Sequence, residues 1–239
     1  MCLHPNYQVA LFSIDALKQL ANKFLQKEEL ANFNFQADFL YPFEVTMKKS
    51  QVADVRSLVV GCILNLVLAW VHNIKSGWSS ILEILKLGSK DPNPIIISES
   101  FQTIQKLLEQ SVSYVKGYVF EIIECLISLG RNWVTEISIS AIKFLGEYTE
   151  SLNLGSTQDW IWFALLKGLA DLMLDLREPV QKQSLASLFH ILNDTQFTPE
   201  QWKMIYSGIL VPVFDDIQYC TPTSRKTVEE LNWIKNTCK

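Results

Sequence analysis

The chain is poor in the two residues that most often interrupt regular secondary structure. Its 239 residues include only 9 glycines and 8 prolines. All-β folds need many turns, and these residues usually form them, so the scarcity argues against an all-β fold. Leucine, isoleucine, lysine, glutamine and glutamate are frequent instead. This composition predicts long helices joined by short connections.

Metal-binding and disulfide signatures are also missing. The five cysteines are an odd number at wide spacing, no C-x-x-C pair occurs, and the three histidines stand apart. This pattern fits neither a disulfide framework nor a zinc site. Cys62 and Cys125 lie in apolar helical stretches, which predicts small core residues in a reducing compartment.

A strong positive charge and a long apolar run are absent as well. The net charge is −4, which argues against a general nucleic-acid binder. The first residues lack the basic start and apolar run of a signal peptide. The longest apolar stretch, residues 57–71, contains Asn65 and is shorter than the roughly 18–20 residues of a membrane span. It therefore predicts a buried helix.

No catalytic motif is recognisable. The phosphate-binding, dinucleotide-binding, zinc-protease and nucleophile-elbow patterns do not occur. Carboxylate pairs occur at Glu28-Glu29, Asp215-Asp216 and Glu229-Glu230. They lie at expected helix ends or polar faces, which favours solvated pairs over acid–base pairs. We therefore predict no catalytic residue, cofactor, metal site or small-molecule substrate.

Apolar residues recur at helical spacing through most of the chain. We expect helices over residues 9–24, 36–48, 52–73, 78–88, 94–110, 112–129, 134–152, 159–176, 179–194, 199–218 and 224–237. Thr198-Pro199 with Gln201 is typical of a capped helix start. Asn93-Pro94 and Glu178-Pro179 show the same cap-then-proline order. Sustained alternation is absent, so strands are not expected.

Five of these segments share one pattern: a valine or isoleucine, a small residue or valine, a small–aliphatic pair and an aliphatic residue. It begins at Val9, Val55, Ile96, Val134 and Val180, with starts 46, 41, 38 and 46 residues apart. Such spacing is typical of HEAT and armadillo repeats, in which stacked helix pairs share one core. The sequence thus predicts an all-α fold, an α-solenoid of HEAT/armadillo-like helix pairs. The alternative is a set of ordinary amphipathic helices.

Residues 27–44 and 73–78 contain more aromatic and polar residues than helix packing requires. The first stretch holds five aromatic residues interleaved with Asn, Gln and Asp, and the second reads N-I-K-S-G-W. The first is interpreted as a corner between helices with phenylalanine anchors, which we favour, or as a recognition edge, because aromatic residues beside polar groups often anchor interfaces. In the second, Lys75-Ser76-Gly77 suits a tight connection before a helix that begins at Trp78.

These stretches also resemble a known family. Residues 14–20, 23–40, 42–44, 73–78 and 101–103 resemble, in order, the first homology region downstream of the catalytic domain in large Arf guanine-nucleotide exchange factors. The most similar group is the brefeldin-inhibited, trans-Golgi class. After about residue 120 the resemblance is weaker, but residues 162–163, 189–192, 213–215 and 233–238 resemble the next downstream region.

The resemblance implies two regions, residues 1–110 and 111–239, in one continuous helical array without a flexible linker. It implies a regulatory segment that is not itself an enzyme, because no counterpart of the upstream catalytic domain is found. The segment would support Arf activation in Golgi vesicle trafficking through membrane recruitment and autoinhibition. Its expected partners are an Arf-class small GTPase, other domains of the same protein and, peripherally, Golgi or trans-Golgi membranes, in a cytoplasmic location; no nucleic-acid partner is expected.

The resemblance also gives candidate protein-binding residues. They are Asn32, Phe33, Asn34, Phe35, Gln36 and Asp38 at one edge, and Lys75, Ser76 and Trp78 at the other. A pure packing role for the same residues is the competing interpretation. Two other functions stay open: a generic HEAT-type protein-interaction adaptor unrelated to Arf, and an enzyme that exchanges nucleotide by itself.

Overall fold

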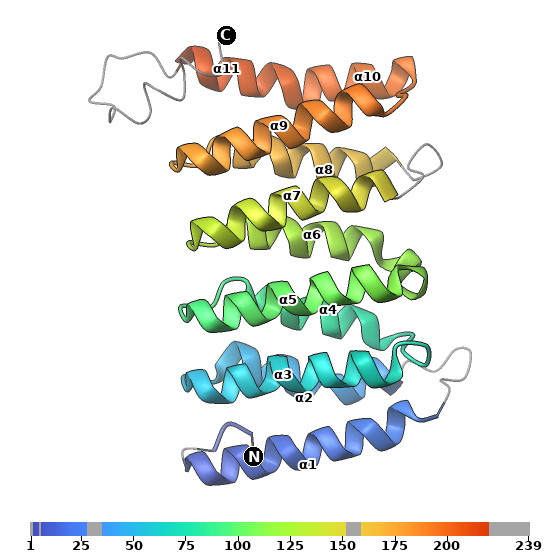
Figure 1. The fold of residues 1–239 in the computed structure, drawn as a ribbon, viewed down its shortest axis with the longest axis vertical. Coiled ribbons are helices and arrows are strands. Elements are labelled where there is room, and N and C mark those ends of the chain that lie inside the picture. Colours follow the sequence, from blue (N-terminus) through green and yellow to red (C-terminus); the bar gives the residue numbers. More distant parts are fainter. Residues whose placement is uncertain (1, 5, 28–34, 152–158, 220–239) are drawn as a thin grey trace. The chain divides into compact units, whose positions relative to one another are not determined.

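The computed structural model describes residues 2–4, 6–27, 35–151 and 159–219. In these ranges the chain forms helices and no strand, which confirms the all-α prediction. The elements are α1 (Tyr7–Leu25), α2 (Phe35–Lys49), α3 (Ala53–Trp70), α4 (Gly77–Gly88), α5 (Pro94–Ser111), the 3-10 helix η1 (Val112–Tyr118), α6 (Val119–Gly130), α7 (Thr135–Ser151), α8 (Asp159–Leu172), α9 (Glu178–Asp194), α10 (Pro199–Ile205), the π-helical η3 (Tyr206–Leu210) and α11 (Val211–Tyr219) (Figure 1).

The chain divides into two compact units, Met1–Leu129 and Gly130–Lys239. In the first, α1, α3 and α5 lie side by side in one layer, and α2 and α4 pack behind them (Figure 1). In the second, α9 packs beside α7 and against α8, which in turn contacts α10 and η3. Stacked helix pairs within each unit confirm the predicted α-solenoid. The predicted boundary between homology regions at residue 110 does not follow from these two compact units and stays a prediction.

The repeat pattern forms the core. All its positions in α3, α5 and α9 are buried, including the fully enclosed Ser100 and Ser184. Ser100 satisfies its hydroxyl by donating to the Ile96 carbonyl at 2.8 Å. A Cβ on Gly88 would lie 2.0 Å from Ser100 Oγ, so the small residues let α4 and α5 approach closely. In α1, by contrast, the last pattern residue, Leu20, is 49% exposed.

A recurring hydrogen bond sets the start of α1, α3, α5, α7 and α9. In each case the side chain two residues before the N-cap accepts from the backbone N–H of the N-cap residue. The acceptors are His4 Nδ1 (3.0 Å), Ser50 Oγ (3.3 Å), Asp91 Oδ1 (2.8 Å), Asn132 Oδ1 (2.6 Å) and Asp175 Oδ1 (2.9 Å). This is the turn geometry that short polar side chains favour. The bond marks the five corners of the repeat.

These corners correct the predicted register of the fourth repeat. Val134, its predicted first residue, occupies the N-cap position, and its carbonyl accepts from Ser138 N–H at 3.0 Å. The other four pattern starts lie three residues after their N-cap, so the equivalent residue is Ile137. Corner spacings of 46, 41, 41 and 43 residues are more regular than the predicted ones. The error arose because three residues is nearly one helical turn, which leaves the apolar face almost unchanged.

The capping predictions are mostly confirmed. Asn93 caps α5 by accepting from Ile95 N–H at 2.9 Å. Thr198 and Gln201 form the expected capping box of α10. At α9, however, the N-cap residue is Arg177, and the predicted cap, Glu178, is already helical.

Two predicted helices are interrupted. Residues 112–129 form η1 and then α6, and Tyr118 at the junction is tied by a hydroxyl donation to the Lys75 carbonyl at 2.8 Å. Residues 199–218 form α10, η3 and α11. A Cβ on Gly208 would lie 2.7 Å from the Phe163 ring, so the π turn accompanies a close approach to α8. The expected helix over 224–237 lies outside the described residues.

Among the described helices, α3 is the one whose length and composition would suit a membrane span. Its mean hydropathy is 1.6 over 18 residues, and 44% of that window is buried. A core helix passes the same test. The buried side of α3 packs against α1, α2, α4 and α5. Here α3 therefore serves as a core helix, as predicted.

Candidate functional site

Residues 71–76 connect α3 to α4, and the Gln36 side chain holds this connection from α2. Gln36 is 1% exposed. Its Nε2 donates to the Asn73 carbonyl at 2.8 Å, and its Oε1 accepts from the N–H groups of Lys75 at 2.7 Å and Gly77 at 3.4 Å. An amide can donate and accept at once, whereas a carboxylate only accepts. The glutamine side chain therefore supplies hydrogen-bond partners to backbone groups of the connection.

Other elements of the first unit hold the same connection. Asn73 Nδ2 donates to the Leu25 carbonyl at the end of α1, at 2.9 Å. Ser76 Oγ accepts from Ala37 N–H at 3.3 Å. With the Tyr118 bond to Lys75, the corner is tied to α1, α2 and η1. We call residues 73–77 and Gln36 the clamped corner.

Close packing continues into α4. A Cβ on Gly77 would lie 3.0 Å from Leu40 Cδ1 and 3.3 Å from Gln36 Oε1, so glycine lets the chain pass close to α2. Trp78 is fully buried. Its Nε1 has no hydrogen-bond partner among the described residues. The ring is therefore held by packing alone, at the cost of one buried donor.

The structure separates the predicted site residues by exposure. Gln36 and Trp78 are buried, Phe35 and Ser76 are half-buried, and Asp38 and Lys75 are exposed. The clamped corner brings Gln36, Lys75 and Ser76 together, and Trp78 points into the core. Asn32, Phe33 and Asn34 lie outside the described residues.

Two participants were not among the predicted residues. Phe24, at the end of α1, is 43% exposed, and its ring lies 4.6 Å from that of Phe39 and 6.3 Å from that of Phe35. Asn73 supplies the tie to α1. In the sequence-based prediction, Phe24 is the last residue of the helix expected over residues 9–24. Its position three residues before the aromatic stretch was the signal that could have indicated its role.

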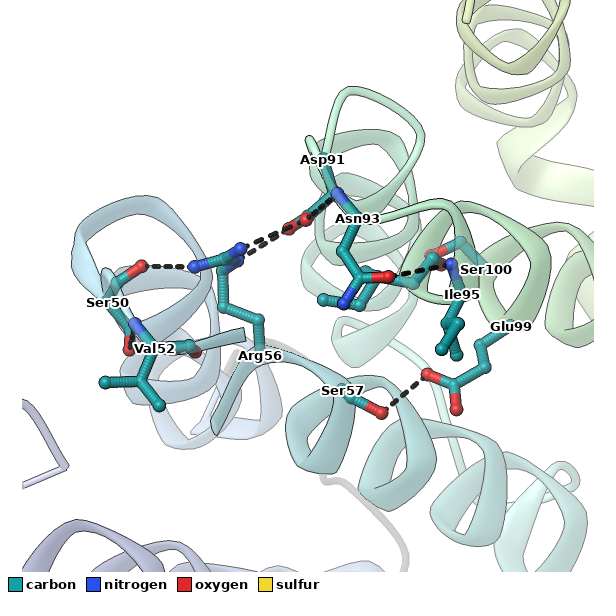
Figure 2. Close-up of polar contacts among 10 residues, drawn as sticks. Ser50, Val52, Arg56, Ser57, Asp91, Asn93, Ile95, Glu99 and Ser100 are labelled. Atoms are coloured by element: carbon teal, nitrogen blue, oxygen red, sulfur yellow. Dashed lines mark hydrogen bonds and ion pairs between the residues drawn. The ribbon is translucent and has the colours of Figure 1, made fainter. Parts of the chain in front are cut away.

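A second polar cluster in the same unit is buried where α3 and α5 begin (Figure 2). Arg56 Nε and Nη2 donate to Asp91 Oδ2 and Oδ1 at 2.6 and 3.1 Å, and Nη1 donates to the Ser50 carbonyl at 2.8 Å. Asp91 also accepts from Asn93 N–H at 2.8 Å. These bonds join two successive corners, which makes the cluster structural.

The thiols of Cys62 and Cys125 are core groups, as predicted. Burial raises the pKa of the Cys62 thiol and raises that of Cys125 to about 12. Both are therefore protonated and weakly nucleophilic at neutral pH. Within the described ranges, no three His, Cys, Asp or Glu side chains are grouped so that they could hold a metal ion.

Comparison with known proteins places these features in a family. Residues 23–106, which include the clamped corner, match the Sec7-like HDS family model, described as Mon2/Sec7/BIG1-like, HDS. The chain is 34% identical over 90% of its length to "Brefeldin A-inhibited guanine nucleotide-exchange protein 1" of Arabidopsis thaliana. It is 29% identical over 98% of its length to the protein of the same name from Homo sapiens. The chain belongs to this Sec7-like HDS family.

This HDS chain spans 15% and 14% of the lengths of those two relatives. Among solved structures, a designed armadillo repeat protein in complex with the peptide (KR)4 aligns with 99% of the chain and 95% of its own, at 16% identity and a TM-score of 0.42.

Proposed function

We propose that this HDS chain is a non-catalytic interaction segment of an exchange factor for Arf-class GTPases. Its relatives are named as guanine nucleotide-exchange proteins, and it corresponds to about one-seventh of their length. The segment would support Arf activation in Golgi vesicle trafficking through membrane recruitment and autoinhibition. It would act in the cytoplasm, peripherally on Golgi or trans-Golgi membranes. Its partners would be the GTPase and other domains of the same protein.

The clamped corner carries this proposal. Hydrogen bonds from α1, α2 and η1 hold this short connection in one conformation. A surface that is rigid before binding loses less conformational entropy on association. The buried Gln36 and Trp78 would thus act by holding the surface in shape rather than by touching a partner.

The contact surface itself would lie beside the corner. Asp38 and Lys75 are exposed there, Phe35 is half-buried, and the His72 and Tyr114 rings lie 6.3 Å apart. Aromatic groups flanked by charges are typical of interface anchors. Asn32, Phe33 and Asn34 belong to the proposed surface by sequence position.

A pull-down with Arf loaded with GTP or GDP tests the proposal. We expect the chain to retain more of the GTP-loaded form and Lys75→Glu to weaken retention by roughly 3- to 10-fold, as for a charge reversal at an interface rim. Lys90→Glu, an exposed reversal in the α4–α5 connection, is the matched control. Negligible binding to both forms, with no effect of the chain on the catalytic part of a relative, would contradict the proposal.

The alternatives predict other outcomes. In a fluorescent-nucleotide release assay the chain alone should not accelerate exchange, and acceleration would show that it is an enzyme itself. The segment can also replace the corresponding part of a brefeldin A-inhibited exchange protein. A generic adaptor unrelated to Arf would not restore Golgi recruitment of that hybrid.

A further inference from the structure

In the second unit α7 and α9 are neighbouring helices (Figure 1), and a groove lies between them. Its volume is about 250 Å³, and it is open to solvent. It is lined by Lys143, Gly146, Glu147 and Glu150 from α7 and by Gln183, Ala186, Ser187 and His190 from α9. None of the candidate protein-binding residues predicted from the sequence lies in it.

The floor of the groove is made of small residues. Gly146 lies within α7, where glycine costs about 1 kcal/mol relative to alanine. Packing does not require it, because a Cβ there would meet only Ser187 Oγ, at an ordinary 3.7 Å. Opposite it, Ala186 and Ser187 are also short. The small residues at these three positions therefore give the groove its depth.

The rim carries unbalanced negative charge. Lys143 Nζ lies 3.7 Å from Glu147, which leaves Glu150 and the neighbouring Asp194 to face His190. His190 Nε2 lies 2.8 Å from Glu150 Oε1, and Nδ1 lies 2.6 Å from Asp194 Oδ2. With either charge state of the imidazole, the three carboxylates of Glu147, Glu150 and Asp194 outnumber the cationic side chains around them. An added ammonium or guanidinium group would balance the remaining charge.

The charge of the surrounding chain has the same sign. Residues 130–219 contain six basic and eleven acidic side chains, a net charge of −5, whereas residues 1–129 contain eleven and twelve, a net charge of −1. A concave site in an acidic surface attracts a positively charged partner and repels an acidic one. We propose that the α7–α9 groove binds a basic segment of a partner protein. The segment would run over Gly146 and place lysine or arginine side chains against Glu147, Glu150 and Asp194.

Fluorescence anisotropy on the full chain tests this inference, which does not depend on the role proposed for the first unit. The probe is a fluorescein-labelled peptide of alternating lysine and alanine. We expect saturable binding that weakens as salt is added. Glu147→Gln and Glu150→Gln should each weaken it by about 3- to 5-fold, as expected for partly exposed ion pairs.

Two further variants separate the groove from general charge. Gly146→Leu fills the floor and should weaken binding by more than about 10-fold, because the peptide backbone can no longer approach. Circular dichroism checks that this variant is folded. Glu109→Gln is the control, since exposed Glu109 lies as many residues after the N-cap of α5 as Glu150 does after that of α7. It should leave binding unchanged.

Several results would overturn the inference. One is equal binding of a glutamate–alanine peptide of the same length. Another is an equal response to Glu109→Gln and to the groove variants, and a third is no binding to the lysine peptide at all. Binding that appears only after residues 220–239 are removed would mean that this segment, with four basic and two acidic side chains, is itself the occupant.

Discussion

Asp91 in the first unit and Asp175 in the second occupy the same place in the repeat, yet they bind arginine differently. Each lies two residues before an N-cap residue and accepts from its N–H. Asp91 pairs with Arg56, 35 residues earlier, and both side chains are less than 10% exposed. Asp175 pairs with Arg177, two residues on, and both are about one-fifth exposed.

The difference shows that capping and coupling between repeats are separate properties. Arg56 joins one corner to the next by a buried, bidentate charge pair. Arg177 instead forms its ion pair within its own corner, with Asp175. It contacts α7 through a 3.2 Å hydrogen bond to Ser138 Oγ. The corner geometry is the same in both units, but a charge pair that links successive repeats is buried in the first unit, at Arg56–Asp91, and about half exposed in the second, at Arg131–Asp171.

Arg56→Met gives the largest expected contrast. It leaves the Asp91 carboxylate buried without its partner, which typically costs about 3–5 kcal/mol. Urea unfolding measures the loss, and hydrogen exchange should locate it in α3 and α5. Arg177→Met is the matched variant and should cost about 1 kcal/mol or less, because that pair is local and partly solvated. Equal losses would contradict the distinction between the two corners.

Gly88→Ala should be the next most damaging change. The new Cβ would overlap Ser100 Oγ, which is fully buried and bonded to the Ile96 carbonyl. Overpacking of this kind costs about 1–3 kcal/mol. Thermal unfolding checks the loss, and adding Ser100→Ala should recover part of it. No recovery would mean that the contact with Ser100 is not the cause.

Gly146→Ala in the second unit should instead raise the free energy of unfolding. Its Cβ meets only an ordinary contact, so the gain in helix propensity of roughly 0.5–1 kcal/mol should remain. The urea midpoint should therefore rise. A fall would show that α7 and α9 pack more tightly at the groove floor than the 3.7 Å distance indicates.

The smallest expected contrast depends on pH. Burial favours the neutral form of Asp175, but hydrogen bonds from Arg177 and its charge outweigh this, so the pKa of Asp175 is lowered. A carboxyl with a lowered folded pKa adds stability above its ordinary pKa of about 3.9, and this stability is lost as pH falls through the folded value.

Asp175→Asn keeps an acceptor for the cap but removes the charge. Compared with the natural chain, its unfolding free energy should therefore fall less steeply in acid below about pH 4. Urea unfolding between neutral pH and acid measures both slopes. Identical slopes would show that the pair with Arg177 adds no pH-dependent stability.

Sequence predicted the features whose signals are local. Helical periodicity and the caps at Asn93 and Thr198 depend on neighbouring residues, and both appear in the structure. The Arg56–Asp91 pair joins residues from different repeats, so no local pattern indicates it. The register of the fourth repeat was assigned wrongly because the pattern identifies only the apolar face of a helix. A shift of three residues, almost one turn, leaves that face nearly unchanged.

The candidate site shows the same limit. Sequence placed Gln36, Ser76 and Lys75 in one group but could not indicate that Gln36 points inward and holds backbone groups. Its burial depends on where α2 meets the α3–α4 connection, 37 residues on. No signal in the sequence indicated the groove over Gly146, because single glycines in helices are common. The groove forms only where Gly146 lies opposite the short residues of α9, which are distant in the sequence.

The recurring corner bond also bears on how such repeats can be detected. Four residue types, histidine, serine, aspartate and asparagine, accept this hydrogen bond at the five corners. Substitutions among them therefore preserve the geometry but change the amino acid. A search keyed on amino-acid letters loses this information. A search keyed on any short acceptor two residues before a helix cap, recurring every 41 to 46 residues, would retain it.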